Sequence, residues 1–473
     1  SDRKVVAYCK GAPDEILSKS TRILLEDRHV VLNNTRKAVV ARQLEEFATE
    51  GFRVLAMATR DLSGELKEYN AETVETDLTF VGLAALQDPP RPAIEATVSS
   101  ARRAGIRVIM VTGDHETTAE AIAKRTGIIT SGDAHVISGS ELSKLDETQL
   151  LRLLDGREIV FARTSPEQKL RIVRALKSRG ETVAVTGDGV NDAPALMEAD
   201  VGIAMGAGGT DVARESADMV LLDNNFISMV EGVRLGRAMF DNLRKFVTYV
   251  FTHNWAQLLA FLVFVFLQVP LPILVVQILA IDLGMDIWPS LALVIEPPEP
   301  GVMDRPPRRA KSRLLDATIL LKALYLGLII GAGSLLWAFQ TWMTGGWSFG
   351  QPAVNDPHIY AKGTAVFVGG IMAGQLGNFL SIRAGSGSAL RLSPLRNRWL
   401  FIGVGLQVCI LLALVYVPFL QPLFNTAPLS SLDWVALYSL AVVVLIVEEA
   451  RKVAARKKDP LIRPIDSAST KPI

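Results

Sequence analysis

Long apolar stretches dominate the second half of this 473-residue chain and restrict what it can fold into. A helix needs roughly 20 apolar residues to cross a hydrocarbon core. Buried helices of a large soluble core are the alternative. Six stretches approach the required length, near 246–268, 272–295, 318–341, 363–382, 399–420 and 433–450.

The charges between these stretches favour the membrane interpretation. Basic residues lie before the first stretch and after the second, fourth and sixth, whereas the other connections contain only Lys362. This alternation is the positive-inside pattern, so we predict an integral membrane protein with six spans and both termini in the cytoplasm. The basic residues are Arg234, Arg237, Arg244, Lys245; Arg305, Arg308, Arg309, Lys311, Arg313; Arg383, Arg391, Arg396, Arg398; and Arg451, Lys452, Arg456, Lys457, Lys458.

Two carboxylates interrupt the second apolar stretch. Asp282 and Asp286 are four residues apart, so a helix places them on one face. A position at the membrane surface is the alternative, but apolar residues flank the pair on both sides. A carboxylate inside a membrane is costly and marks a pathway, so we predict that the pair binds a transported cation. Gly284 between them allows local unwinding that would expose carbonyl oxygens to a hard cation.

Neutral polar residues in the other stretches are candidates for the same site. Asn254 and Gln257 add amide oxygens at helical spacing in the first stretch. Gln375, near Asn378 in the fourth stretch, is a further candidate, with hydrogen bonding between helices as an equal alternative. His253 is predicted to pack or form hydrogen bonds rather than to bind the ion.

The first 240 residues resemble a soluble protein in which strands and helices alternate. Strands followed by amphipathic helices predict an α/β domain, with a parallel sheet covered by helices on both faces. The expected strands are 80–86, 107–114, 158–163, 182–192, 199–206 and 217–222, and the expected helices are 92–104, 116–126, 167–178 and 193–198.

The strand ends of this domain carry residues suited to phosphate chemistry. Thr112 and Gly113 precede a helix and offer a hydroxyl and an N–H to an anion. Lys169 supplies positive charge, while Asp188 and Asp192 suit Mg²⁺ and its water shell. The net charge of +1 gives no reason to expect a nucleic-acid partner, and the two cysteines form no metal or disulfide pattern.

Six motifs together resemble the P-type ATPase family over nearly the whole chain. Their order matches the family: KGAPD (10–14), FRVLAMA (52–58), DPPRP (88–92), VTGD (111–114), FARTSPEQK (161–169) and TGDGVNDAPAL (186–196). The resemblance implies a haloacid-dehalogenase-like domain joined to an all-α bundle of six membrane spans, with ATP and Mg²⁺ as cofactors.

The same resemblance implies roles for individual residues and a division into domains. Asp188 would hold Mg²⁺, and the phosphate would contact Thr112, Gly113, Lys169 and Asn191. The ATP side would include Lys10, Gly11, Arg53, Arg163 and nearby Asp114. The implied domains are a nucleotide-binding remnant (1–80), a phosphorylation domain (81–240), the membrane helices (241–458) and a cytoplasmic tail (459–473).

The chain also departs from the family pattern. IDLGMD (281–286) resembles the sodium/potassium and proton/potassium pumps, but Gln257 replaces a usual glutamate and the fourth stretch offers only Gln375. The sequence contains neither DKTGT, with the aspartate that the family phosphorylates, nor TGES. We therefore expect the C-terminal part of an ATP-driven cation pump of the cell membrane, with the missing N-terminal half as its partner and the ion left open. A membrane-tethered phosphatase and an inert scaffold are the alternatives.

Overall fold

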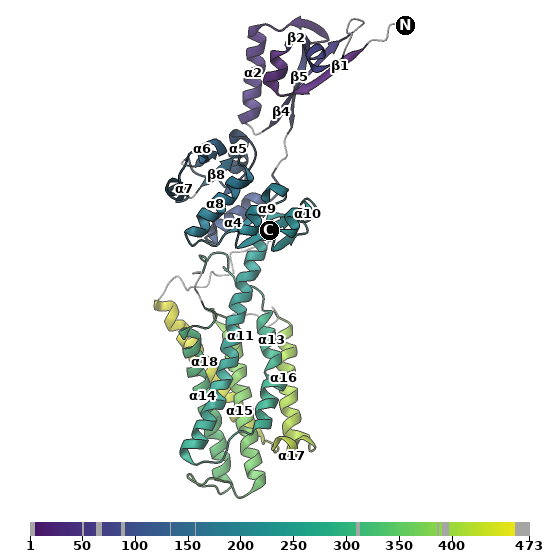
Figure 1. The fold of residues 1–473 in the computed structure, drawn as a ribbon. Helices are drawn as coiled ribbons and strands as arrows, with labels where there is room; N and C mark the ends of the chain where they lie inside the picture. Colours follow the sequence, from purple (N-terminus) through teal and green to yellow (C-terminus); the bar gives the residue numbers. More distant parts are fainter. Residues whose placement is uncertain are drawn as a thin grey trace. The chain divides into compact units, whose positions relative to one another are not determined.

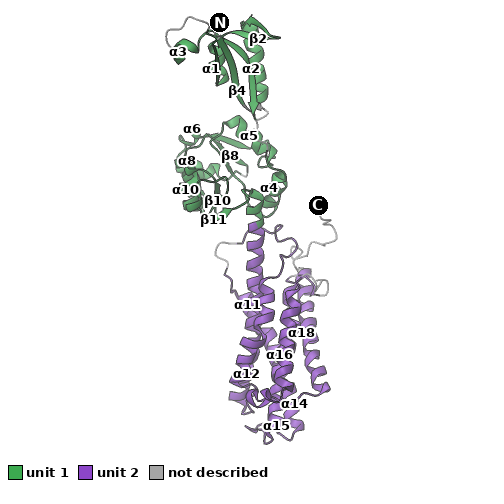
Figure 2. Cartoon of the chain, turned by 90° about the vertical axis from the view of Figure 1, so that its right-hand side faces the viewer, with its two compact units in different colours: residues 1–231 green, residues 232–473 purple. Residues whose placement is uncertain are grey.

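The structure is a computed structural model that describes residues 5–49, 52–62, 69–86, 90–132, 134–156, 158–308, 313–385, 387–389 and 397–458. The chain divides into two compact units, residues 1–231 and 232–473, which Figure 2 colours separately. Each unit is described by itself.

The first unit begins with a five-stranded sheet in the order β1-β4-β5-β2-β3. Its long strand β4 pairs antiparallel with both β1 and β5. Ala56 and Ala58 of β4 are buried together with Leu78 and Phe80 of β5, which forms the core of this sheet. The elements are β1 (Val6–Gly11), α1 (Pro13–Ser18), β2 (Ser20–Leu25), β3 (Arg28–Val31), α2 (Asn34–Thr49), β4 (Arg53–Asp61), α3 (Ala71–Val74) and β5 (Leu78–Leu86).

The strand expected at 80–86 therefore forms as β5, but it lies in this first sheet and not in the parallel arrangement that follows. The reason is its pairing: β4 pairs with β5 from Arg53–Leu86 to Thr59–Thr79, and β2 pairs with the start of β5, from Leu78 to Phe80.

The rest of the first unit contains two parallel three-stranded sheets, in the orders β6-β8-β7 and β11-β10-β9. Helices separate the strands along the chain (Figure 1). The elements are α4 (Ile94–Arg103), β6 (Met110–Val111), α5 (Glu116–Arg125), β7 (His135–Ser138), α6 (Gly139–Leu142), α7 (Glu147–Leu153), β8 (Ile159–Ala162), α8 (Pro166–Ser178), β9 (Ala184–Gly187), the short 3₁₀-helix η1 (Val190–Asp192), α9 (Ala193–Glu198), β10 (Val201–Met205), α10 (Asp211–Glu215) and β11 (Met219–Leu221).

Strand β8 shows why helices cover both faces of its sheet. All four of its residues are buried. Ile159 and Phe161 pack in one core cluster with residues of α7 and α8, whereas Val160 and Ala162 pack in another with α4 and α5. Because successive side chains of a strand point to opposite faces, an apolar strand such as this one needs cover on both sides. The expected parallel arrangement with helices on both faces is confirmed.

The second unit is helical, and the part of the chain that the structure describes contains the six expected helical segments long and apolar enough to cross a membrane. Its main helices run side by side in Figure 1. The elements are α11 (Phe226–Leu267), which starts just before the boundary between the units, α12 (Val275–Leu279), the π-helix η2 (Ala280–Met285), α13 (Ile287–Val294), α14 (Ala317–Thr344), α15 (Pro357–Arg383), α16 (Trp399–Tyr416), α17 (Leu420–Phe424) and α18 (Ser431–Lys458). The segments α12, η2 and α13 together make one span.

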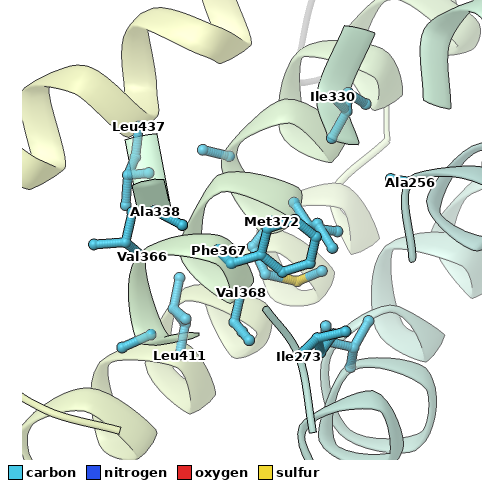
Figure 3. Packing of buried hydrophobic residues seen from close by; sticks show 14 of the residues in the cluster. Ala256, Ile273, Ile330, Ala338, Val366, Phe367, Val368, Met372, Leu411 and Leu437 are labelled. Atoms are coloured by element: carbon cyan, nitrogen blue, oxygen red, sulfur yellow. The ribbon is translucent and has the colours of Figure 1, made fainter. Parts of the chain in front are cut away.

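Helix α15 lies at the centre of this bundle, and 89% of its most apolar 18-residue stretch is buried. Figure 3 shows Phe367 and Met372 of α15 packed among side chains of the neighbouring helices. Glycines allow the close approach: a Cβ at Gly377 would lie 2.2 Å from the carbonyl oxygen of Ala441 on α18. Small residues at helix contacts are typical of membrane bundles. Burial on all sides explains how this helix accommodates polar Gln375 and Asn378, because both face protein.

Candidate functional site

Thr112 directly follows β6, and its backbone is hydrogen-bonded to strand β8 and to the loop that follows β8. Its N–H donates to the carbonyl of Phe161 at 2.8 Å, and its carbonyl accepts the N–H of Thr164 at 3.1 Å. Its hydroxyl oxygen accepts the N–H of Asp114 at 3.1 Å, so the turn into α5 is closed locally. Gly113 and Asp114 are exposed in this turn. The Thr112 hydroxyl also donates to Asp114 Oδ2 at 3.2 Å, so an anion bound where β6 ends would have to replace the Asp114 carboxylate as its partner.

The turn after β9 is organised by one carboxylate. Oδ2 of Asp192 accepts the N–H groups of Asp188 at 3.3 Å and Gly189 at 3.2 Å, while Oδ1 pairs with Lys169 Nζ at 2.6 Å. A Cβ at Gly187 would lie 2.4 Å from that of Asp192, so only glycine fits there. Asp192 therefore positions the turn and Lys169, and its oxygens are already used.

Asp188 differs from Asp192 in its surroundings. Its side chain is exposed and, within the described residues, makes no hydrogen bond or ion pair, whereas its carbonyl accepts the N–H of Thr210 at 2.9 Å. The backbone is thus held while the carboxylate stays free. A free carboxylate on a rigid turn fits Mg²⁺, which binds through one or two carboxylates and keeps several waters. Asn191 is exposed in the same turn.

Lys169 owes its position to the start of α8. Ser165 caps this helix by accepting the N–H of Gln168 at 3.3 Å, and Gln168 returns a bond from its side chain to the N–H of Ser165 at 2.9 Å. This reciprocal capping box, with Pro166 at the first helical position, fixes where the helix begins. Lys169 follows about one turn later. Its side chain is 20% exposed, so the ammonium group is largely buried but still reachable from solvent.

Both phosphate motifs therefore stand at the carboxyl ends of parallel strands. Val111 of β6 and Val185 of β9 pack on the same core cluster. Among the described residues, β6 is hydrogen-bonded only to β8 and β9 only to β10, so both are edge strands. In α/β sheets, ligands bind outside the carboxyl ends of the strands.

The predicted nucleotide residues are more scattered. Lys10 is exposed on β1 opposite Met57, and Gly11 ends that strand. Arg53 starts β4, but its side chain lies outside the described part of the chain. Arg163 is exposed directly after β8, with a left-handed backbone (φ 50°), and its N–H donates to the carbonyl of Asp114 at 2.9 Å. Arg163 and Asp114 thus lie next to Thr112, whereas Lys10 and Gly11 belong to the first sheet.

In the second unit, the two aspartates of the 272–295 stretch meet one histidine. His253 Nε2 lies 3.3 Å from Asp282 Oδ1, and His253 Nδ1 lies 2.7 Å from Asp286 Oδ2. Gln257 donates to Asp282 Oδ1 at 3.2 Å, Tyr249 to Asp286 Oδ1 at 3.1 Å and Gln407 to the same oxygen at 3.4 Å. We call these six residues the carboxylate cluster.

Local helix geometry aligns the members of this cluster. Tyr249, His253 and Gln257 are each four residues apart on α11, so they share one face. On the facing span, the N–H of Asp286 bonds to the carbonyl of Ile281, five residues back, at 2.8 Å. This is a π-helical bond, and short π segments are frequent at functional sites. The unwinding expected at Gly284 takes this form, in which the segment widens but stays helical.

Two predicted cation ligands make no hydrogen bond to Asp282 or Asp286 within the described residues. Asn254 is exposed, because it follows His253 and a helix turns each successive side chain by about 100°. Gln375 is fully buried but donates to the backbone carbonyl of Tyr249 at 3.0 Å and accepts from Asn378 at 2.8 Å. It therefore forms the hydrogen bonds between and within helices that were the alternative expectation.

Tyr249 and Gln407 were missed from the sequence. A single glutamine in the otherwise apolar run of α16 was a signal for Gln407, but nothing in the sequence relates Tyr249 to Asp286. Gln407 is also within 3.2 Å of the Met372 sulfur, which ties α16 to α15 beside the cluster.

Comparisons with known proteins identify the family of the chain. Residues 1–93 match the family model for the P-type ATPase cytoplasmic domain N, and residues 270–454 match that for the cation-transporting ATPase C-terminus. The chain is similar to a calcium-transporting ATPase of Bacillus subtilis (34% identity over 93% of this chain and 48% of the relative) and to a probable cation-transporting ATPase F of Mycobacterium tuberculosis (36%, 93% and 48%). It is also similar to the potassium-transporting ATPase alpha chain 2 of Oryctolagus cuniculus (34%, 96% and 47%).

The chain spans about half the length of the curated relatives it matches. The chain belongs to the P-type cation-transporting ATPase family.

Proposed function

We propose that this chain is the C-terminal part of an ATP-driven pump that moves a cation across the cell membrane. The observation that carries the proposal is the pair Asp282 and Asp286 inside a membrane span, of which Asp286 is buried and Asp282 is partly exposed, in a chain that also has phosphate motifs at two strand ends. The complete pump would use ATP and Mg²⁺, and its partners would be the cation, lipid and an N-terminal half that contributes the phosphorylated aspartate. Both termini of this chain would be cytoplasmic.

At the phosphate site, we assign roles from the polar groups of each side chain that protein contacts do not already occupy. Lys169 and the turn at Thr112 would bind phosphate oxygens and stabilise charge that develops during transfer. Asp188 would hold Mg²⁺, which supplies a positive charge that neutralises the phosphoryl group. Asp192 would keep Lys169 and the Asp188 turn in place, through the contacts at 2.6 Å and 3.3 Å.

Helix α11 is the element that can couple this site to the carboxylate cluster. It runs without interruption from Phe226 to Leu267 and carries three members of the cluster. At its cytoplasmic half, Arg237 donates to the carbonyl of Arg305 at 2.8 Å, and Lys245 pairs with Glu299 at 2.6 Å. The connection after α13 is thus bound to α11, so a displacement of α11 would also move the span that bears Asp282 and Asp286.

Replacement of the two aspartates tests this function. Asp282→Asn and Asp286→Asn in the full-length pump, purified into proteoliposomes, should weaken activation by the transported cation but leave ATP affinity nearly unchanged. ATP hydrolysis is measured against sodium, potassium, calcium and pH in separate series. Asp433→Asn is the matched control, because this buried carboxylate pairs with Lys362 and lies outside the carboxylate cluster. Unchanged activation by every ion in both variants would refute the proposal.

The chain by itself should not form an acid-stable phosphoenzyme, because it contains no DKTGT sequence. Incubation of the purified chain with γ-labelled ATP tests this expectation. Stable label on this chain would mean that the phosphorylated residue lies within it.

A further inference from the structure

The His253 imidazole stands between the two carboxylates that the proposed function assigns to the ion. One ring nitrogen faces Asp286 at 2.7 Å and the other faces Asp282 at 3.3 Å. The side chains of His253 and Asp286 are only 4% and 3% exposed, so their contact is buried, whereas the Asp282 side chain is 38% exposed. Two carboxylates four residues apart repel each other, and a donor between them reduces that repulsion.

The contact with Asp286 is close but poorly directed. Although Nδ1 of His253 and Oδ2 of Asp286 are 2.7 Å apart, neither atom makes a hydrogen bond within the described residues. Buried polar atoms are nearly always hydrogen-bonded, so an unbonded pair needs an explanation. Oδ1 of Asp286, in contrast, accepts from both Tyr249 and Gln407. Oδ1 of Asp286 is therefore held by two hydrogen bonds. Oδ2 lies close to the His253 ring but accepts no hydrogen bond from it.

An ion that bridged Asp282 and Asp286 would need the space that the ring takes. Hard cations such as Ca²⁺ bind oxygens at about 2.3–2.6 Å, closer than either contact of the imidazole. The other groups that bond to the pair each contact one carboxylate: Gln257 of α11 bonds to Asp282, and Tyr249 of α11 and Gln407 of α16 bond to Asp286. Within the described residues, His253 alone contacts both carboxylates.

We propose that His253 is a specificity-determining residue that occupies the cation position. In the structure its ring lies where the transported ion would bridge Asp282 and Asp286. The ring turns away about its side-chain bonds when the ion enters, and it returns when the ion leaves. Each cation must therefore compete with a tethered side chain, which lowers the affinity of the site and disfavours ions that bind carboxylates weakly. This inference rests on the proposed function.

Removal of the ring tests the inference in the full-length pump. In His253→Ala, the cation concentration that gives half-maximal activation should fall on the order of tenfold, because the tethered ring no longer competes for the space between the carboxylates. His253→Gln keeps a side-chain donor, so its half-maximal activating concentration should fall less. His358→Ala is the matched control, since His358 is exposed at the start of α15, and it should leave the activation curve unchanged.

Equilibrium binding of radioactive sodium, rubidium and calcium to the same purified proteins supplies a second measurement. Tighter binding in His253→Ala cannot come from a damaged fold, which would weaken binding. Unchanged or weaker binding in His253→Ala would overturn the inference if Asp282→Asn and Asp286→Asn still impair activation. If the proposed function itself were wrong, the result would differ. No ion would then activate the unmodified pump, and the activation curves of Asp282→Asn and Asp286→Asn would match that of the unmodified pump.

Discussion

The Nζ atom of Lys169 lies 2.6 Å from Oδ1 of Asp192, and the other oxygen of Asp192 accepts two N–H groups of the turn that carries Asp188. This relationship divides the acidic residues of the TGDGVND segment into two roles. Asp192 is saturated by protein contacts, whereas the Asp188 carboxylate is free of them within the described residues. The phosphate site thus has a positioning aspartate and a separate aspartate available to a metal.

We predict that Lys169 and Asp192 act as a pair. Lys169→Met and Asp192→Asn should each lower turnover of the full-length pump by about tenfold to a thousandfold, because each disturbs charge stabilisation at the phosphate. Turnover of the double variant should be little lower than that of either single variant, since the effects of residues in one network do not add. Steady-state ATP hydrolysis measures the effect, and Asp211→Asn, an exposed carboxylate paired within its own helix, is the control. Losses that multiply in the double variant would contradict the pairing.

Asp188→Asn should remove most turnover while membrane insertion stays normal. The replacement keeps the shape of the side chain but removes a charged ligand from Mg²⁺. The measurements are ATP hydrolysis against Mg²⁺ concentration and protease protection of the membrane helices. A variant with normal phosphorylation and turnover would show that Asp188 serves only the turn after β9.

The proposed topology predicts which loops are reached from outside the cell. A cysteine at Asn355, between α14 and α15, should react with an impermeant thiol reagent in intact cells, whereas one at exposed Arg313, before α14, should react only after the membrane is opened. The positive-inside pattern is the physical reason. Cys9 and Cys409 are first replaced by serine. Reaction at position 313 in sealed cells would exclude both termini from the cytoplasm.

Glu158 should make the stability of the first unit depend on pH. Burial opposes its ionisation, but hydrogen bonds from Thr130 and Ser131 outweigh burial and lower its pKa from 4.5 to about 2. A carboxylate with a depressed folded pKa stabilises the fold above its unfolded pKa, and that stability is lost as the pH falls from about 4.5 toward about 2.

Glu158→Gln should therefore cost about 1–3 kcal/mol in the free energy of unfolding at neutral pH and flatten the acid dependence. Urea-dependent hydrogen exchange of peptides from β7 and β8 measures both quantities. Glu215→Gln, at an exposed position of α10, is the control and should leave them unchanged. Equal acid sensitivity of Glu158→Gln and the unmodified protein would rule out Glu158 as the source.

Local sequence determined the segments of this protein. Helix α14 could be found at 318–341 because the transfer of a helix into a membrane depends on the summed hydropathy of about 20 adjacent residues. Thr112 and Asp188 could be assigned to strand ends because glycine-containing turns after apolar runs are also local features. The helix at 193–198 is likewise observed with its expected bounds.

Tertiary structure decided which polar groups meet. His253 faces the carboxylates and its neighbour Asn254 does not, because the rotation of α11 is set by packing against other helices. Gln407 reaches Asp286 across 121 positions of sequence, and β5 joins the first sheet because β4 pairs with it. Hydropathy adds up residue by residue along the chain, whereas a contact between side chains depends on the register and rotation of two packed elements. Those are fixed by long-range pairings such as that of Gly377 with Ala441, for which no short stretch of sequence carries a signal.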